Sequence, residues 1–380
     1  MPTARGLLVA GGGLVLCVAG ALLGYRGVLL LGALALLAVA GASLSVLAGR
    51  PTRAEVRRGV PLTRTAPGRA VTVRLTVAGA GRAGPVRLRE RVAAAGEEGE
   101  TTLVPAAPDA PEAGRWEAAY RLEPSRRGVV ELGPLRVERT DVLGLAAAGR
   151  PSGTVDRVLV HPRWRRLRAL PTGQASTPDS VRGGSRPGGL AFRSLRDYVP
   201  GDDVRRVHWR STARSGRLLV REYSDTSDTR LTVLLDDRAA GGRERLDATA
   251  EAAACVVATA ALSRLPCDLV LASGPGVDGH AGLPAALDLL AAAVPAPDAD
   301  LAAALRTLRA GTGGGAVVLV SDAPHESDLR EFATLRDRFP RLVAAVVGPS
   351  RPDEVAGVTL VAARDAAEFG EVWDGAPWTR

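Results

Sequence analysis

The chain contains no lysine, no isoleucine and no asparagine, so all 49 of its basic residues are arginine. Without lysine, the chain has neither a phosphate-loop lysine nor a residue that forms a Schiff base. Without asparagine, it has no Cys-His-Asn triad and no acceptor for N-glycosylation. These absences exclude the enzymes that depend on those groups and leave arginine as the source of positive charge.

Cysteine is also scarce, because the 380 residues include only Cys17, Cys255 and Cys267. No two of them form a Cys-x-x-Cys pair, so the spacing predicts neither a zinc cluster nor a disulfide framework. Free thiols in the soluble part fit a reducing compartment. The formal net charge of +8 indicates nucleic acid or an anionic membrane surface as a partner, and the N-terminal residues favour the membrane.

The first fifty residues, 1–50, predict a transmembrane helical hairpin. Two uncharged apolar runs, 6–23 and 28–47, are each long enough to cross about 30 Å of hydrocarbon at about 1.5 Å per residue. Arg5 precedes the first run and several arginines follow the second, so the positive-inside rule places both termini in the cytoplasm. A cleavable signal peptide fits less well, because the apolar region is too long and Arg26 divides it. The lipid bilayer is therefore the first predicted partner.

Residues 51–165 predict a small β-sandwich, because short segments alternate apolar and polar residues with a period of two between prolines and glycines. The segment 124–145 differs from its surroundings. We expect turns at Gly128 and at the Gly-Pro pair that begins at residue 133, with Asp141 capping the turn that follows. No catalytic cluster accompanies these strands.

Residues 166–190 are rich in proline, glycine and serine and lack periodicity, which predicts a flexible linker. Residues 230–380 then alternate between apolar strands and helices, as in an α/β domain with a mostly parallel sheet covered on both faces. Such sheets bind ligands at the carboxyl ends of their strands. Asp236 and Asp322 follow the first and third predicted strands and are candidates for that position.

Residues 191–229 form a turn-helix-strand motif between the linker and the α/β domain. Seven arginines and four carboxylates fall within 195–223. A Pro-Gly pair followed by two aspartates predicts a turn and a helix N-cap. A short helix should then end at Gly216, and 217–223 should form a strand.

Three functions compete for this motif. An enzyme could use His208 as a base oriented by Asp202 or Asp203, although no nucleophile or metal-ligand spacing accompanies it. A nucleic-acid surface could use the arginines, but carboxylates alternate with them and aromatic residues are few. A third interpretation fits better. Bidentate pairs between arginine and carboxylate would fix the motif on the following domain, with Trp209 packed beneath, and the exposed remainder would meet a partner protein.

The motif resembles the signature of a bacterial family known as domain of unknown function 58. The residues that carry the resemblance, and that we take as the interaction motif, are Leu195, Arg196, Asp197, Tyr198, Pro200, Gly201, Asp202, Asp203, Arg205, His208, Trp209, Arg210, Ala213 and Arg214. The segment 124–145 and the membrane hairpin are similar to the regions that precede the motif in that family. The resemblance implies a von Willebrand factor A-like α/β domain and a MoxR-type AAA+ ATPase as partner.

Von Willebrand A domains often hold Mg²⁺ in a D-x-S-x-S loop, the metal-ion-dependent adhesion site. Here Asp236 and the later Asp322 match that site, whereas Arg238 and Ala240 replace the two serines. Because Mg²⁺ prefers oxygen ligands in octahedral geometry, we expect no metal and no other cofactor, with the Arg238 guanidinium neutralising both aspartates instead. The sequence thus predicts a non-enzymatic, membrane-anchored scaffold or adaptor with a degenerate adhesion site. The alternative is a hydrolase-type enzyme that uses His208 and neighbouring carboxylates.

Overall fold

The computed structural model of the protein divides into two compact units, Met1–His161 and Pro162–Arg380. The residues that the structure describes are 2–48, 55–59, 63–78, 86–94, 97–103, 116–171, 190–199, 202, 207–225, 230–311 and 313–379.

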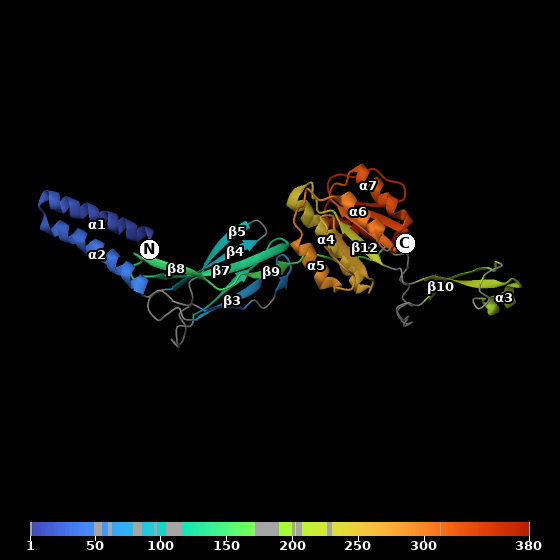
Figure 1. Ribbon diagram of the computed structural model, residues 1–380, viewed down its shortest axis with the longest axis horizontal. Helices are drawn as coiled ribbons and strands as arrows, with labels where there is room; N and C mark the ends of the chain where they lie inside the picture. The colour runs from blue at the N-terminus through green and yellow to red at the C-terminus, as the bar shows by residue number, and fades with distance from the viewer. Residues whose placement is uncertain are drawn as a thin grey trace. The chain divides into compact units, whose positions relative to one another are not determined.

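Two apolar helices open the chain, α1 (Ala4–Leu23) and α2 (Arg26–Ala48). Both are long and apolar enough to cross a membrane, and they lie side by side as the predicted hairpin (Figure 1). Glycine permits their close approach, since a Cβ on Gly32 would lie 2.6 Å from the backbone nitrogen of Cys17. Small residues at such contacts let helices pack in lipid, where no hydrophobic force drives them together.

The remainder of the first unit is a β domain with two sheets. The first sheet has the order β1-β3-β6, and the second has the order β2-β9-β7-β4-β5, with β8 also paired to β7. The strands are β1 (Glu55–Gly59), β2 (Arg64–Thr65), β3 (Val71–Ala78), β4 (Val86–Ala94), β5 (Glu97–Leu103), β6 (Trp116–Leu122), β7 (Gly128–Thr140), β8 (Ala147–Ser152) and β9 (Asp156–Val160). Inward-facing residues of both sheets fill one core, which includes Val73, Leu75, Val77, Leu88, Leu132, Leu135 and Val158.

Strand β7 differs from the prediction, because it runs unbroken through the Gly-Pro pair where a turn was expected. Its pairing with β4 shifts register between Glu90 and Val92. The Gly-Pro dipeptide at residues 133–134 therefore lies in a β-bulge. A bulge accommodates a proline, which has no N–H for the ladder. Gly133 has φ +100°, a conformation that glycine adopts at little cost.

A buried ion cluster lies beside this bulge. The Arg58 Nε donates to Glu90 Oε1 at 3.0 Å, and the same guanidinium also contacts the Asp156 carboxylate. The side chains of Arg58 and Glu90 are almost completely buried. Burial raises the pKa of Glu90, an effect that the neighbouring Arg58 opposes. The alternating sequence pattern indicated β3, β4, β6, β7 and β9 but gave no sign that β1 and β4 share a buried charge pair.

Replacing Glu90 by alanine should lower the free energy of unfolding by about 3–5 kcal/mol, because the Arg58 guanidinium would stay buried without its main partner. Glu131→Ala is the matched control. Its carboxylate meets Arg157 at 3.0 Å on the exposed surface of the same domain, where an ion pair contributes about 0–1 kcal/mol. Urea unfolding of the full chain in detergent measures both effects. Equal losses in the two variants would contradict the assigned role of the buried pair.

The second unit contains a six-stranded sheet in the order β14-β13-β12-β15-β16-β17, parallel except for β14. Its strands are β12 (Leu231–Leu235), β13 (Cys267–Leu271), β14 (Gly276–Val277), β15 (Ala316–Ser321), β16 (Arg341–Val347) and β17 (Thr359–Ala363). Its helices are α4 (Gly242–Leu262), α5 (Gly282–Ala292), α6 (Leu301–Ala310), α7 (Glu326–Ala333) and α8 (Ala366–Asp374), with 3-10 turns Thr334–Asp337 and Pro377–Thr379.

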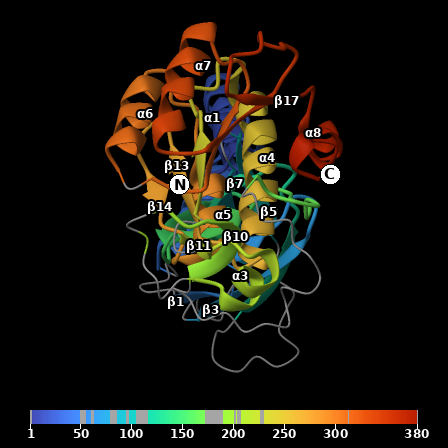
Figure 2. The ribbon, with the colours of Figure 1, turned by 90° about the vertical axis from the view of Figure 1, so that its right-hand side faces the viewer.

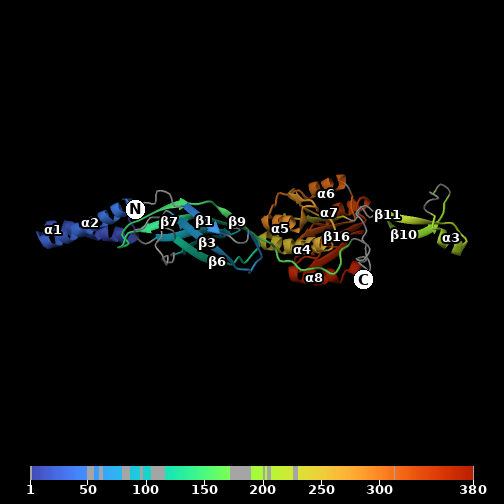
Figure 3. The ribbon, with the colours of Figure 1, turned by 90° about the horizontal axis from the view of Figure 1, so that it is seen from below.

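Helices cover both faces of this sheet, as predicted from its continuously apolar strands. Figure 3 shows α6 and α7 on one face and α4 and α8 on the other. Each face has its own core. Leu231, Val233 and Leu235 of β12 pack toward α4, whereas Leu234 packs toward α6 and α7. The mixed α/β character of the C-terminal part is therefore confirmed.

The boundary of this unit differs from the predicted one, because residues 166–171 pack on the α/β sheet and its helices. Leu167 and Leu170 lie in the core on the side of α4 and α8. The Leu167 N–H donates to Thr259 Oγ1 at 2.9 Å, and the Trp373 ring N–H donates to the Ala169 carbonyl at 2.9 Å. The rest of the predicted linker, 172–189, lies outside the described residues.

The motif forms a two-stranded antiparallel sheet of β10 (Leu190–Asp197) and β11 (Leu219–Asp225), joined through the short helix α3 (Trp209–Ser215). Figure 2 shows α3 beside the two strands. The second strand was predicted from the sequence, whereas the first, which contains Leu195, Arg196 and Asp197, was not recognised as a strand.

Candidate functional site

The carboxyl ends of β12 and β15 meet at the point where the strand order of the α/β sheet reverses. The chain continues from β12 to β13 on one side and from β15 to β16 on the other, and such switch points are where open α/β sheets bind ligands. Asp236 directly follows β12, and Asp322 directly follows β15. The two candidate residues therefore lie on adjacent strand ends, as the sequence predicted.

Arg238 occupies this position with its guanidinium. Its Nε donates to Asp236 Oδ1 and its Nη2 donates to Asp236 Oδ2, both at 2.8 Å, and Ser321 Oγ donates to the same Oδ2 at 2.7 Å. Asp236 is buried, so the fork provides the counter-charge that a buried carboxylate requires. The hydrogen bonds to Asp236 raise the pKa of Arg238 above its usual range.

The second carboxylate of this cluster is Asp328 rather than the expected Asp322. The Nη2 of Arg238 donates to Asp328 Oδ2 at 2.8 Å, and Asp328 lies in the first turn of α7. Asp322 instead accepts the backbone N–H of Gly241 at 2.9 Å, next to the start of α4. The expectation that Arg238 neutralises Asp322 was wrong, because the backbone already satisfies that carboxylate and Asp328 lies nearer the guanidinium.

Asp237 is a buried member of this loop that sequence reasoning missed. Its Oδ1 accepts the backbone N–H of Ser273 at 2.9 Å, and its carbonyl accepts the N–H of Ala296 at 2.8 Å. It therefore ties the loop after β12 to the loops that follow β13 and α5. The available signal was the pair of consecutive aspartates after a buried strand, of which only the first was assigned a role.

The residues at the switch point do not fit a magnesium ion. A guanidinium lies between Asp236 and Asp328, and Ala240 offers no side-chain oxygen where the adhesion motif has a hydroxyl. Across the described ranges of the chain, no three histidine, cysteine, aspartate or glutamate side chains are grouped so that they could hold a metal.

Replacing Arg238 by alanine should lower the free energy of unfolding by about 3 kcal/mol, because Asp236 would remain buried with most of its counter-charge removed. Arg330→Ala is the matched control, since Arg330 pairs with Glu326 on the exposed side of α7, where such a pair contributes about 0–1 kcal/mol. Thermal and urea unfolding of the full chain in detergent compare the two. If both variants lose the same small amount, the Arg238 fork does not stabilise the site.

Calorimetry provides a separate check of the same site. The wild-type chain should show no heat of Mg²⁺ binding in the micromolar range, because the guanidinium carries the charge that a cation would otherwise supply. Micromolar binding by the wild type would contradict this role of Arg238.

The helix of the motif begins later than predicted, and its cap is a histidine. Val207 forms a β-bridge with Val220, which holds the chain extended and delays α3 to Trp209. His208 is the N-cap. Its Nδ1 accepts the Ser211 N–H at 3.3 Å and lies 2.8 Å from Ser211 Oγ. The N-cap is therefore a histidine and not the predicted aspartate. Histidine is not among the residues preferred at N-caps.

Trp209 is 61% exposed, so the expectation that it packs beneath the motif was wrong. Val199, Leu218 and the arginines of α3 and the following turn are exposed as well. Backbone hydrogen bonds from Tyr198 to Leu218 and from His208 to Leu219, both 2.8 Å, bring these segments together. We call this the motif surface, and its members are Val199, Trp209, Arg210, Arg214, Arg217 and Leu218.

One exposed ion pair lies beside the motif surface. Arg217 Nη1 lies 3.9 Å from Asp197 Oδ2, and both side chains are mostly exposed. Asp202 accepts the backbone N–H of Val199 at 2.9 Å, as in a turn. Arg210, Ala213 and Arg214 lie in α3. Four further predicted residues lie outside the described residues, namely Pro200, Gly201, Asp203 and Arg205.

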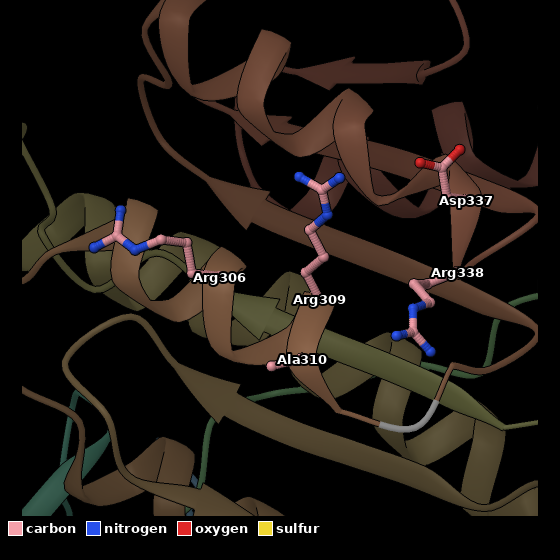
Figure 4. A pocket seen from close by; sticks show the side chains of 5 residues that line it. All are labelled: Arg306, Arg309, Ala310, Asp337 and Arg338. Atoms are coloured by element: carbon pink, nitrogen blue, oxygen red, sulfur yellow. The ribbon is translucent and has the colours of Figure 1, made fainter.

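A separate hollow of about 410 Å³ lies between α6 and the turn that follows α7. It is lined by Arg306, Arg309, Ala310, Asp337 and Arg338. Figure 4 shows the three guanidinium groups pointing in different directions rather than toward a common centre. Arg306 is also held by Asp300 at 3.2 Å. The hollow therefore lacks the convergent groups that define an anion site.

The fold and the motif define a mixed α/β protein with an N-terminal apolar hairpin, in which no catalytic constellation is evident among the described residues. Residues 194–372 match the family model described as "Protein of unknown function DUF58". The resemblance drawn from the sequence is thereby confirmed for the part of the chain that contains the motif and most of the α/β sheet.

Two other kinds of similarity are weaker. "Uncharacterized protein YeaD" from Bacillus subtilis (strain 168) is 27% identical over 121 residues, which span 31% of this chain and 30% of that protein. Cwp6 from Clostridium difficile aligns with 84% of this chain and 39% of its own at 9% identity and a TM-score of 0.17. Spo0M, a sporulation control protein from Bacillus subtilis, aligns with 46% of this chain and 68% of its own at 14% identity and a TM-score of 0.15. Structural scores this low carry no argument about the fold.

Proposed function

We propose that the protein is a membrane-anchored, non-enzymatic adaptor that works with a MoxR-type AAA+ ATPase and docks it on the motif surface. The observation that carries this proposal is the exposure of Trp209 among arginines within the matched family region. Tryptophan and arginine are both enriched in protein-binding hot spots, where the ring supplies apolar area and the arginines bind carboxylates. The partner surface should accordingly be acidic around an apolar pocket.

The proposal includes a von Willebrand A-like interpretation of the α/β sheet. Counted along the chain, its strands have the order 3-2-1-4-5-6, with the third strand antiparallel and the first in the centre. This order places Asp236 and Asp322 at the switch point, where a ligand would bind. Because Arg238 fills that position with an internal cation, the site is a degenerate adhesion site and the binding function moves to the motif surface.

Both termini and the folded units are proposed to lie in the cytoplasm. The support is the distribution of arginine around α1 and α2, with Arg5 in the first turn of α1 and Arg50, Arg53 and Arg57 following α2 in the sequence. A cytoplasmic location would also give the motif access to an ATPase.

Crosslinking in membranes followed by affinity capture of the full chain should recover an AAA+ ATPase. Trp209→Ala should reduce that recovery about tenfold or more. Loss of a hot-spot tryptophan that becomes buried in the complex costs about 2 kcal/mol or more of binding free energy. Trp164→Ala is the matched control, since Trp164 is also partly exposed but lies outside the motif. Arg214→Ala should have a smaller effect in the same direction.

Two results would contradict this assignment. Failure of the wild type to recover an AAA+ ATPase would refute the partner. Recovery that is equal for Trp209→Ala and the wild type would refute the motif surface as the docking site.

The second candidate function is a hydrolase, and the specific observation that favours it is the distance of 2.8 Å between His208 Nδ1 and Ser211 Oγ. A serine beside an imidazole is the core of a nucleophilic dyad. Here, however, the same Nδ1 also accepts the Ser211 N–H as a helix cap, so the imidazole lone pair is engaged by the backbone.

A fluorophosphonate probe labels activated serines. We therefore expect the wild-type chain and the Ser211→Ala variant to be labelled equally. Ser211→Ala removes the candidate nucleophile, and Ser215→Ala removes a nearby hydroxyl of the same helix as the matched control. Labelling that persists in Ser215→Ala and disappears in Ser211→Ala would establish the hydrolase and refute the adaptor as a non-enzyme.

A further inference from the structure

The tip that joins β7 to β8, residues 141–146, carries an unusual pair of side chains. Val142 is 89% exposed and Leu143 is 66% exposed. Hairpin tips in water usually consist of glycine, asparagine, aspartate or serine, because these residues satisfy the turn backbone and remain hydrated. Two adjacent aliphatic side chains at such a tip indicate a non-aqueous partner.

The tip is held in one conformation by Asp141. Its Oδ2 accepts the Leu143 N–H at 2.9 Å, and its Oδ1 accepts the Ala146 N–H at 2.6 Å. Gly144 completes the turn with φ +70°, and its N–H donates to the Asp141 carbonyl at 3.1 Å. The aliphatic pair is therefore presented outward on a fixed support. This is the capping role expected for Asp141, with an unexpected consequence for the two residues that follow it.

The same tip contacts the start of the first apolar helix. The Thr3 N–H donates to the Leu145 carbonyl at 2.9 Å, and Thr3 Oγ1 donates to the Gly144 carbonyl at 2.6 Å. The approach is so close that a Cβ on Gly6 would lie 2.0 Å from the Leu145 oxygen. Only glycine fits at that position of α1 without a shift of one of the two segments.

The base of the tip also packs against the second apolar helix. Leu145 and Ala146 share a buried cluster with Val39, Ala42 and Val46 of α2. Because Val39 and Val46 lie seven residues apart in α2, this cluster extends about 10 Å along the helix at about 1.5 Å per residue. The tip therefore lies beside the final turns of the predicted span, in the region where the hydrocarbon of a bilayer would end.

We propose that Val142 and Leu143 insert into the membrane at this level, so that the β domain has its own lipid contact beside the helical hairpin. The inference rests on the proposed membrane anchor. Lipid is the occupant that the surroundings favour, since Leu7 and Leu8 of α1 are also exposed just after the glycine that touches the tip. The aliphatic pair thus continues a surface that faces lipid, and the fixed tip sets the distance of the β domain from the bilayer.

Depth-dependent quenching in the full-length chain tests the insertion. A Cys17→Ser background removes the thiol of α1, while Cys255 and Cys267 are buried. Single cysteines replace Leu143, Val155 or Leu37 and carry an NBD fluorophore. Each protein is reconstituted into phosphatidylcholine–phosphatidylglycerol vesicles with or without nitroxide-labelled acyl chains. Val155 is the matched control, because it is an aliphatic residue of the same domain, 48% exposed, that follows the opposite end of β8.

The label at Leu143 should be quenched at least about threefold more than the label at Val155, because insertion to about 5–10 Å brings it within reach of the nitroxides. The label at Leu37, in α2, reports the anchor. Val142→Cys gives a second position on the tip, and it should behave as Leu143→Cys does.

Three results would overturn the inference, and they are distinguishable. Quenching at Leu37 with none at Leu143 and Val142 would refute insertion of the tip and leave the anchor intact. No quenching at Leu37 would refute the proposed anchor itself, and the inference with it. A blue-shifted emission at Leu143 without quenching would show that protein, such as a second copy of the chain, covers the tip in place of lipid.

Discussion

The bidentate pair between Arg238 and Asp236 is the constraint on which the α/β unit depends. It joins the loop after the central strand β12 to the start of α7 through Asp328, and it supplies the charge that buried carboxylates need at a strand end. A metal ion could satisfy the same carboxylates, but it would do so reversibly. The Arg238 guanidinium is part of the chain and is therefore always present at full occupancy. At this switch point, where other α/β sheets bind ligands, it serves to hold the fold together.

Because Arg238 neutralises Asp236 internally, the exposed surfaces of the molecule are where a partner would bind. At the switch point the Arg238 guanidinium contacts Asp236 and Asp328, and the guanidinium groups that line the hollow beside α6 do not converge. What the chain exposes is apolar area supported by tightly fixed backbone. Trp209 follows a histidine cap, and Val142 follows an aspartate whose carboxylate holds the turn. In both places a polar side chain at the base of a short turn precedes an exposed aliphatic or aromatic group.

Sequence periodicity was sufficient for much of the fold. The apolar runs of the hairpin have the length and composition of helices that can cross a membrane, and the continuously apolar strands after residue 230 have the pattern that burial on both faces requires. Contacts distant in sequence were harder to predict. Asp322 was assigned from its place after a strand and from the resemblance to an adhesion site, neither of which indicates that Asp328, 90 residues from Arg238, reaches the guanidinium. Trp209 was expected to pack beneath a network of arginine–carboxylate pairs, and the packing of 166–171 was missed because its proline-rich and glycine-rich neighbours dominated the composition.

The packing of residues 166–171 on α4 and α8 has a mechanical consequence. Along the chain, residues 166–171 precede the motif and β12 follows it. Both flanking segments belong to the α/β unit: the first is held by the hydrogen bonds of Leu167 and Trp373, and the second is a strand of the sheet. Tension applied to the motif would therefore be divided between two attachment points on one domain.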